Sequence, residues 1–359
     1  MCGIAGIIHR DGSADIGTEM TSMLQSMKHR GPDSAGYALY GEPGELVVIR
    51  FKLADANDPR DFDFKERLER ARQEVESRLN KIGASIDRVE SETEYAYRAV
   101  VRYDGDMKAL ADYLEDVPGC EVLSLGHSLE IVKDLGDAQQ VSDLYKLGGF
   151  AGTHAIGHVR MATESDVDIS SAHPYWAYPF SDVAVVHNGQ LTNYFQWKRR
   201  LEFNGERFQS ECDSEIIAVY LAEKMSDGDS LEDAMHKSLE DLDGVFTYMA
   251  VTKDALGVAK DAMAAKPLVL YESDELVAMA SEEIAIRAVL GREIDTYDPY
   301  ESEVLVWTRC RAIGVSRTTR EAWSSRSRRC RRSRRSTARR RPSTRPTSPP
   351  GRSTWSSDG

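Results

Sequence analysis

Residues 1–8 read MCGIAGII and place a cysteine directly after the initiating methionine. A methionine followed by a small residue is normally trimmed, so we expect Cys2 to carry both a thiol and a free α-amino group. With ordinary pKa values of about 8.5 and about 7.7–8.0, these groups supply a nucleophile and a nearby base on one residue. The stretch is also apolar and short, which predicts a strand over Gly3–His9. Taken alone, Cys2 is more simply explained as a small apolar residue that begins this buried strand.

The composition is that of a globular protein. The chain has 359 residues, of which 41% are hydrophobic and 29% charged, enough for a large core or two domains. Five scattered cysteines without a C-x-x-C pair suggest neither a disulfide framework nor a zinc site. We therefore expect a reducing, cytoplasmic compartment. No apolar run approaches the ~20 residues that span a bilayer, and we expect no membrane association.

The net charge of −13 hides a division between the body of the chain and its end. Residues 301–359 hold 16 arginines, no lysine and four acidic residues, a net charge of +12, whereas residues 1–300 carry −25. The Arg-, Ser- and Pro-rich stretch 310–359 is expected to be a disordered tail. One interpretation is a basic arm for nucleic acid, but the acidic body would repel a phosphate backbone. The abrupt change favours a frameshift product without function, and resequencing the gene would test this.

Apolar periodicity indicates how the rest of the chain is organised. Segment 52–148 has a charged helix over Phe64–Lys81 and an alternating strand over Tyr95–Tyr103, typical of a small inserted α/β module. From residue 149 to 309, strands return together with amphipathic helices, which predicts stacked sheets covered by helices. We therefore expect one domain over residues 2–309, interrupted by the module at 52–148. The module contains no catalytic cluster, so a structural or docking role is expected for it.

Four polar clusters stand out beyond Cys2: HRGPD at 29–33, HVRMAT at 158–163, HNG at 187–189 and ECDSE at 211–215. Each has an ordinary structural explanation when it is taken alone. An Asn-Gly pair is most often a hairpin turn, an Asp-Ser pair a helix N-cap, and a lone arginine a surface ion pair. His158 and His187, near strand ends, would be core histidines with satisfied ring nitrogens.

Together with the N-terminal cysteine, these clusters resemble the class II glutamine amidotransferase domain, a member of the N-terminal-nucleophile hydrolases. The resemblance covers roughly residues 2–50 and 149–300, in the family's order. It implies an α+β fold, a four-layer αββα sandwich, with the module inserted into it. The insert and the sequence AIGHVRMATES at 155–165 look most like the amidotransferase subunits of split, glutamate-synthase-like enzymes, of which N-methylglutamate synthase is one.

The resemblance implies a role for each matched residue. Cys2 would be the nucleophile, with its own amine as the base. Arg160 would hold the α-carboxylate of glutamine, a planar anion that suits a two-pronged guanidinium, and Asp213 would hold the α-ammonium. The side-chain amide of Asn188 and the backbone N–H of Gly189 would form the oxyanion hole.

Four further residues are expected around this centre. Arg30 and Gly31 would shape their loop against Cys2, while Thr163 and His173 would line the pocket. The reaction would pass through a γ-glutamyl thioester that water then cleaves to glutamate. Neither a metal nor another cofactor is expected.

The resemblance also implies partners. The substrate would be L-glutamine, and the ammonia would pass to a separate, flavin-binding synthase subunit. Three alternatives stay open: an amidase on another γ-glutamyl amide, a glutamine-sensing assembly subunit without turnover, and a nucleic-acid binder through the tail. The presence of Cys2, Asn188 and Gly189 argues against the sensing subunit.

Overall fold

The computed structural model describes residues 2–162, 167–180 and 182–309, which belong to one compact unit, Met1–Arg311. Thr163 and the tail from residue 310, with the expected frameshift, lie outside the described residues.

The N-terminal strand is central in a six-stranded antiparallel sheet. Ile4, Ile7 and Ile8 are all 0% exposed, although successive side chains of a strand point to opposite faces. Both faces of the strand are therefore covered, which explains why its sequence is continuously apolar. The strands run in the order β15 (Val269–Glu272), β16 (Leu276–Ala280), β1 (Gly3–His9), β10 (His154–Arg160), β3 (Ser34–Tyr40) and β8 (Leu129–Leu135).

A second, five-stranded sheet packs against the first. Strands β1 and β10 contact β12 (Ala184–Leu191) and β13 (Gly244–Thr252) across the space between the sheets. At Gly6 a side chain would begin only 3.0 Å from Met249 Sδ, so a glycine permits the sheets to approach here. The order is β11 (Tyr175–Trp176), β12 (Ala184–Leu191), β13 (Gly244–Thr252), β14 (Ala255–Lys260) and β17 (Val304–Thr308).

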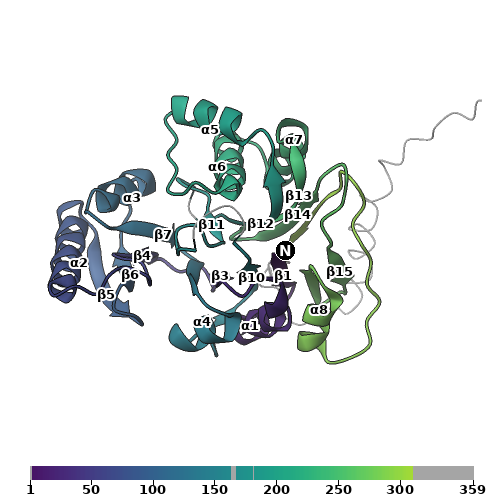
Figure 1. Ribbon diagram of the computed structural model, residues 1–359, viewed down its shortest axis with the longest axis horizontal. Helices are drawn as coiled ribbons and strands as arrows, with labels where there is room; N and C mark the ends of the chain where they lie inside the picture. The colour runs from purple at the N-terminus through teal and green to yellow at the C-terminus, as the bar shows by residue number, and fades with distance from the viewer. Residues whose placement is uncertain (1, 163–166, 181, 310–359) are drawn as a thin grey trace, which may run out of the picture. The chain divides into compact units, whose positions relative to one another are not determined.

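Helices cover the outer face of each sheet. Helices α1 (Ile16–Ser26), α4 (Ala138–Leu144) and α8 (Glu283–Leu290) pack on the six-stranded sheet. On the five-stranded sheet lie α6 (Asp213–Ser226) and α7 (Leu231–Asp241), with α5 (Tyr194–Phe203) beside α6. Figure 1 shows the resulting succession of helices, sheet, sheet and helices. The predicted αββα sandwich is confirmed.

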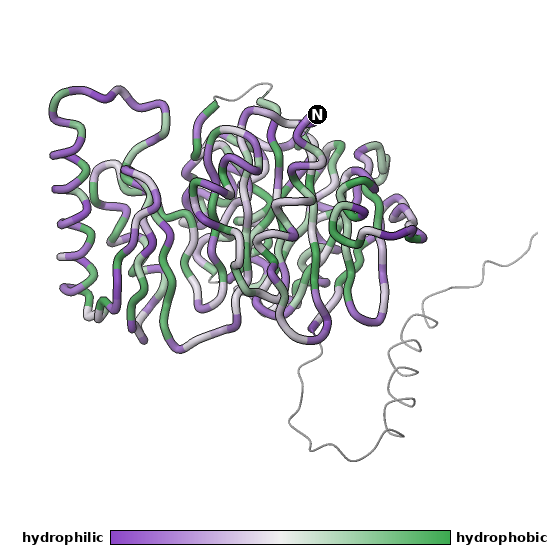
Figure 2. Tube along the Cα trace, turned by 90° about the horizontal axis from the view of Figure 1, so that it is seen from below, coloured by the Kyte–Doolittle hydropathy of each residue, from purple (hydrophilic) through white to green (hydrophobic). Residues whose placement is uncertain are grey.

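A separate four-stranded sheet forms the module that the sequence predicted as an insert. Its outer helix α2 buries one apolar face, and Figure 2 shows hydrophobic and hydrophilic residues alternating around the turns of this helix, at the left of the view. The sheet order is β5 (Ser85–Ser91), β6 (Ala96–Arg102), β4 (Val47–Lys52) and β7 (Glu121–Gly126), with α2 (Phe64–Lys81) and α3 (Met107–Glu115) packed on it.

The strand pairing places both boundaries of the module earlier in the chain than the expected segment 52–148. Strand β4 already belongs to the four-stranded sheet, whereas β8 and α4 belong to the first sheet and its helix layer. The chain changes sheets between Gly126 and Leu129, where the buried carboxylate of Asp182 accepts hydrogen bonds from the backbone N–H groups of residues 127, 128 and 129. We call residues 47–126 the module.

Three smaller features complete the fold. Strands β2 (Ala14–Asp15) and β9 (Ala151–Gly152) form a two-stranded sheet, and the 3-10 helix η1 (Lys28–Arg30) follows α1.

Among the described residues, no helix is long and apolar enough to cross a membrane.

Candidate active site

Cys2 precedes β1 and lies against the end of the neighbouring strand β10. Its thiol is half-buried and directed at the backbone oxygen of Met161, with a sulfur-to-oxygen distance of 3.8 Å. Met161 follows Arg160, the last residue of β10, and Gly3 pairs with Val159 of that strand. The strand pairing thus brings the candidate nucleophile next to the segment that carries the candidate arginine.

Arg30 fixes the backbone of Cys2. Its Nε donates to the Cys2 carbonyl oxygen at 3.0 Å, and its Nη1 donates to Glu282 at 2.7 Å. Burial opposes ionisation of Glu282, but hydrogen bonds from Arg30 and His29 outweigh it and hold the pKa of this carboxyl below its usual range. The ion pair therefore persists near neutral pH and anchors the guanidinium that holds Cys2.

Gly31 allows the polar loop to contact the end of β10. A side chain at this position would begin 2.4 Å from the carbonyl carbon of Val159 and 2.5 Å from the backbone nitrogen of Arg160. Two residues later, the Asp33 carboxylate accepts from the backbone N–H of Ala162 at 2.8 Å. The loop thus contacts the chain on both sides of Arg160.

Asn188 and Gly189 lie near the end of β12 in the second sheet. The Asn188 side chain is 3% exposed, and its Nδ2 donates no hydrogen bond to any described residue. A buried donor without an acceptor costs about 1–3 kcal/mol, which makes this amide a candidate donor to a bound ligand. A side chain at Gly189 would begin 2.3 Å from the Val245 carbonyl oxygen, which explains the glycine.

Asp213 is the first residue of α6, and it bonds to the same strand. Its Oδ2 accepts a hydrogen bond from the backbone N–H of Leu191 at 2.7 Å, two residues after Gly189. Its Oδ1 lies 3.3 Å from Ser214 Oγ and 3.9 Å from His187 Nδ1. A carboxylate at a helix N-terminus is favoured by the helix dipole, so Asp213 can hold a negative charge here.

Three buried histidines connect the two sheets behind these residues. The His173 ring lies 4.0 Å from that of His158 on β10 and 6.4 Å from that of His187 on β12, between ring centroids. His173 Nε2 is 3.8 Å from the Cys212 sulfur, beside Asp213. The structure therefore places His173 next to the residue that precedes Asp213.

The histidines are buried as expected, but their ring nitrogens are not all satisfied. Within the described residues, His158 Nε2, His173 Nδ1 and His187 Nε2 have no hydrogen-bond partner. Burial is the main cause that lowers the pKa of all three, to about 3 for His158. The imidazoles are therefore neutral at physiological pH. No group of His, Cys, Asp or Glu that could hold a metal ion occurs in the described part of the chain.

Acidification should destabilise the fold through its buried histidines. Burial lowers the pKa of His154 to about 4 and that of His158 to about 3, whereas the unfolded chain titrates near ~6.5. The unfolded state then binds more protons below pH ~6.5, so stability is complete above that pH and falls as the pH decreases. At pH 5.5 we expect a loss of about 1.4 kcal/mol for each of His154 and His158.

Urea unfolding at pH 7.5 and 5.5 would measure this loss. His158→Gln should remove part of the pH dependence. An unfolding free energy that is the same at both pH values would contradict the prediction.

Sequence reasoning did not identify several residues that surround the candidate site. Ser214 bonds to His187 at 2.7 Å, Cys212 contacts His173, and Glu282 anchors Arg30. Cys212 and Ser214 stand inside the ECDSE cluster, so their position beside Asp213 was a usable signal. Glu282 lies far along the chain in an ordinary helix start, and no local pattern distinguishes it.

Comparisons with known proteins identify the family. Residues 158–288 match the model of a glutamine amidotransferase domain. A Methanothermobacter thermautotrophicus protein described as a glutamine amidotransferase is 38% identical over 311 residues, covering 85% of this chain and 99% of that protein. The glutamine amidotransferase-like protein GlxB of Rhizobium meliloti is 35% identical, covering 79% of this chain and 89% of that protein.

The fold is also found in a solved structure. The glutamine phosphoribosylpyrophosphate amidotransferase of B. subtilis superposes with a TM-score of 0.54 at 20% identity. The match covers 86% of this chain and 47% of that one, so this chain spans about half of that protein.

Proposed function

The chain belongs to the class II glutamine amidotransferases, and from this membership we propose that it hydrolyses L-glutamine to glutamate and ammonia through a thioester on Cys2. The observation that carries the proposal is the position of Cys2. Its backbone is held by Arg30, and its thiol is directed at the Met161 carbonyl, next to Arg160. This position supports a nucleophilic role for Cys2, and Arg160 would supply the cation that suits the carboxylate end of an amino acid.

The first half of the reaction forms the thioester. The α-amine of Cys2 accepts the thiol proton, and the sulfur attacks the carboxamide carbon of glutamine. The carbonyl oxygen becomes an oxyanion that accepts hydrogen bonds from Asn188 Nδ2 and the Gly189 N–H. When the carbon–nitrogen bond breaks, the protonated amine returns its proton to the departing nitrogen, which leaves as ammonia.

The second half regenerates the enzyme. Water attacks the thioester carbon while the amine of Cys2 accepts a proton from it. The carbon–sulfur bond then breaks, glutamate is released, and the sulfur recovers its proton from the amine. Arg160 and Asp213 would hold the two charged ends of the substrate throughout, so that the carboxamide stays over the sulfur.

Turnover by the purified full chain tests this proposal. We expect glutamate and ammonia to form in equal amounts from glutamine, and added hydroxylamine to trap the thioester as γ-glutamyl hydroxamate. Glutamate formation without any trapped hydroxamate would contradict the covalent route. Failure to release glutamate at all would contradict the proposed activity.

Arg160→Lys should weaken glutamine binding. Arg160 is 4% exposed, and a lysine offers one ammonium where the guanidinium offers a two-pronged donor. Losing a hydrogen bond to a charged group costs about 1.5–3 kcal/mol, so kcat/KM for glutamine should fall about tenfold to a hundredfold, mainly through KM. Steady-state kinetics would measure the change. Arg10→Lys, which alters the pair with Glu272 at the other end of β1, serves as control and should have little effect.

We further propose that the ammonia passes to a separate synthase subunit that binds flavin. The Methanothermobacter relative is matched over 99% of its own length, so it holds the same domain and little else. Purification of the tagged chain from its native host should yield a flavin-containing partner in a fixed ratio, with faster glutamine hydrolysis in the complex. A chain that is fully active alone and recovers no such partner would contradict this assignment.

A further inference from the structure

The module forms hydrogen bonds and ion pairs with two loops of the amidotransferase fold. The first loop, residues 204–212, joins α5 to α6 and ends immediately before Asp213. The second, residues 167–172, precedes His173. Between the module and the first loop lies a cleft of about 620 Å³, and none of its lining residues is one of the predicted site residues.

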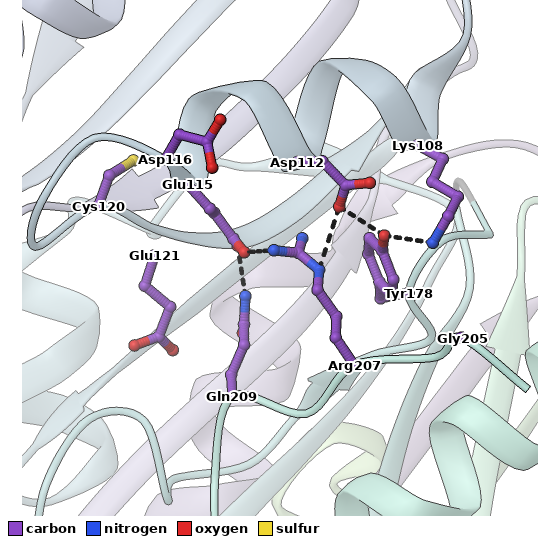
Figure 3. A pocket seen from close by; sticks show the side chains of 10 residues that line it. All are labelled: Lys108, Asp112, Glu115, Asp116, Cys120, Glu121, Tyr178, Gly205, Arg207 and Gln209. Carbon is purple, nitrogen blue, oxygen red and sulfur yellow. Dashed lines mark hydrogen bonds and ion pairs between the residues drawn. The ribbon is translucent and has the colours of Figure 1, made fainter. Parts of the chain in front are cut away.

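Helix α3 of the module holds the first loop by its charged side chains. Figure 3 shows Arg207 of the loop between Asp112 and Glu115 of the helix. Arg207 Nε lies 3.2 Å from the Asp112 carboxylate, Arg207 Nη1 bonds to Glu115, and Gln209 Nε2 donates to the same Glu115. Only 10% of the Glu115 side chain is exposed, and the oxygen that accepts from Gln209 also accepts from the backbone N–H of Val122 on β7. We call Asp112, Glu115, Arg207 and Gln209 the clamp. Because Glu115 is bonded to β7, the clamp is anchored in the module's own sheet.

The same loop is held from the other side by the helix that begins with Asp213. The buried Glu215 carboxylate accepts from the backbone N–H groups of Gln209 and Ser210 at 2.8 Å, and from Ser210 Oγ at 2.7 Å. Gln209 is thus bonded to Glu115 through its side chain and to Glu215 through its backbone. A displacement of α3 would be transmitted through this residue to the start of α6, where Asp213 stands.

The second loop is tied to the module as well. Asp55 accepts from the backbone N–H of Ile169 at 3.2 Å, and Glu121 accepts from Ser170 Oγ at 2.6 Å. The six-stranded sheet holds the loop as well, because the buried Lys133 side chain on β8 donates to the carbonyl oxygens of Ser170 and Ala172 at 3.2 and 2.8 Å. This loop leads directly to His173, so the two loops meet where His173 contacts Cys212.

We propose that Asp112 and Glu115 are positioning residues for glutamine, acting on Asp213 through Arg207 and Gln209. This inference rests on the proposed function, because it assigns a role to the module in the binding of the substrate's α-ammonium. Since small displacements of a binding group can cost up to about a hundredfold in rate, the clamp sets the efficiency with which glutamine is used. A partner that moved the module would change glutamine affinity by the same route.

Arg207→Met tests the clamp, because methionine retains an aliphatic stem but cannot bond to Asp112 or Glu115. We expect KM for glutamine to rise about tenfold while kcat changes less than about twofold. The discriminating substrate is 4-carbamoylbutanoate, which has the carboxamide and the carboxylate of glutamine but no α-ammonium. The ratio of kcat/KM for glutamine to that for this analogue should fall about tenfold in the variant.

Controls separate positioning from general damage. Arg72→Met breaks ion pairs with Glu69 and Glu76 on α2 of the same module and should leave the ratio unchanged. Arg207→Lys should restore part of it. If Arg207→Met does not fold, Gln209→Met removes the other bond to Glu115 and should lower the ratio in the same direction.

The outcomes distinguish this inference from the proposed function. A wild-type chain that hydrolyses glutamine, combined with an unchanged ratio in the folded Arg207 and Gln209 variants, would overturn the positioning role alone. Equal losses for both substrates would overturn it too, because they would indicate a purely structural effect. A wild-type chain without glutaminase activity would overturn the proposed function itself.

Discussion

Replacing Cys2 with alanine should reduce glutamine hydrolysis to the background rate. The variant keeps the α-amine but has no sulfur to attack the carboxamide, so neither the thioester nor its hydrolysis can occur. Removal of a catalytic nucleophile can cost about 10⁶-fold in kcat, a larger effect than we expect from any other single substitution in this chain. Glutamate and ammonia release, measured with and without hydroxylamine, would report the loss.

A second cysteine provides the matched control. Cys120 is 9% exposed at the edge of the module, and burial raises the pKa of its thiol to about 12, so it is a protonated thiol at neutral pH. Cys120→Ala should retain glutaminase activity. Full activity in Cys2→Ala would show that another group is the nucleophile and would contradict the proposed mechanism.

The maturation of the terminus adds an independent check on the same residue. Intact mass of the active protein should correspond to a chain that begins at Cys2, because the amine can act as a base only after Met1 has been removed. An active enzyme that retains Met1 would exclude the α-amine of Cys2 as the base.

Replacing Asn188 with alanine should lower kcat by about 10²–10³ while KM for glutamine changes little. The Asn188 amide is buried, and its Nδ2 has no acceptor among the described residues, as expected of a donor kept for charge that develops during the reaction. The interaction strengthens in the transition state, so its loss is measured in kcat rather than in substrate binding. Steady-state kinetics over a range of glutamine concentrations would separate the two parameters.

Asn193→Ala is the comparison for this substitution. Asn193 lies five residues further along, where its Nδ2 donates to the Asp241 carbonyl oxygen at 2.9 Å in an exposed turn. We expect that variant to lose some stability but to keep its kcat. A rise in KM for glutamine at constant kcat in Asn188→Ala would contradict the oxyanion role and indicate a role in ground-state binding.

Local patterns in the sequence predicted much of the architecture. The short apolar run after Cys2 predicted the strand β1 over Gly3–His9, and the charged, one-sided pattern over Phe64–Lys81 predicted α2 with the same bounds. The membership of β4 and β8 was not predictable in this way. Both are short strands near the ends of the expected segment 52–148, and the alternation of residues along a strand does not say which neighbour the strand will pair with.

The sequence by itself determined the chemistry available to this protein: a cysteine that can bear a free amine, an arginine at a strand end, an Asn-Gly pair and an aspartate at a helix start. These depend on residue type and local conformation, which neighbouring residues specify. Only the tertiary structure decided how the groups are held, because Arg30 and Glu282, or Arg207 and Glu115, come from distant parts of the chain. Such contacts form when sheets and helices pack, and packing is a property of the whole fold rather than of any segment.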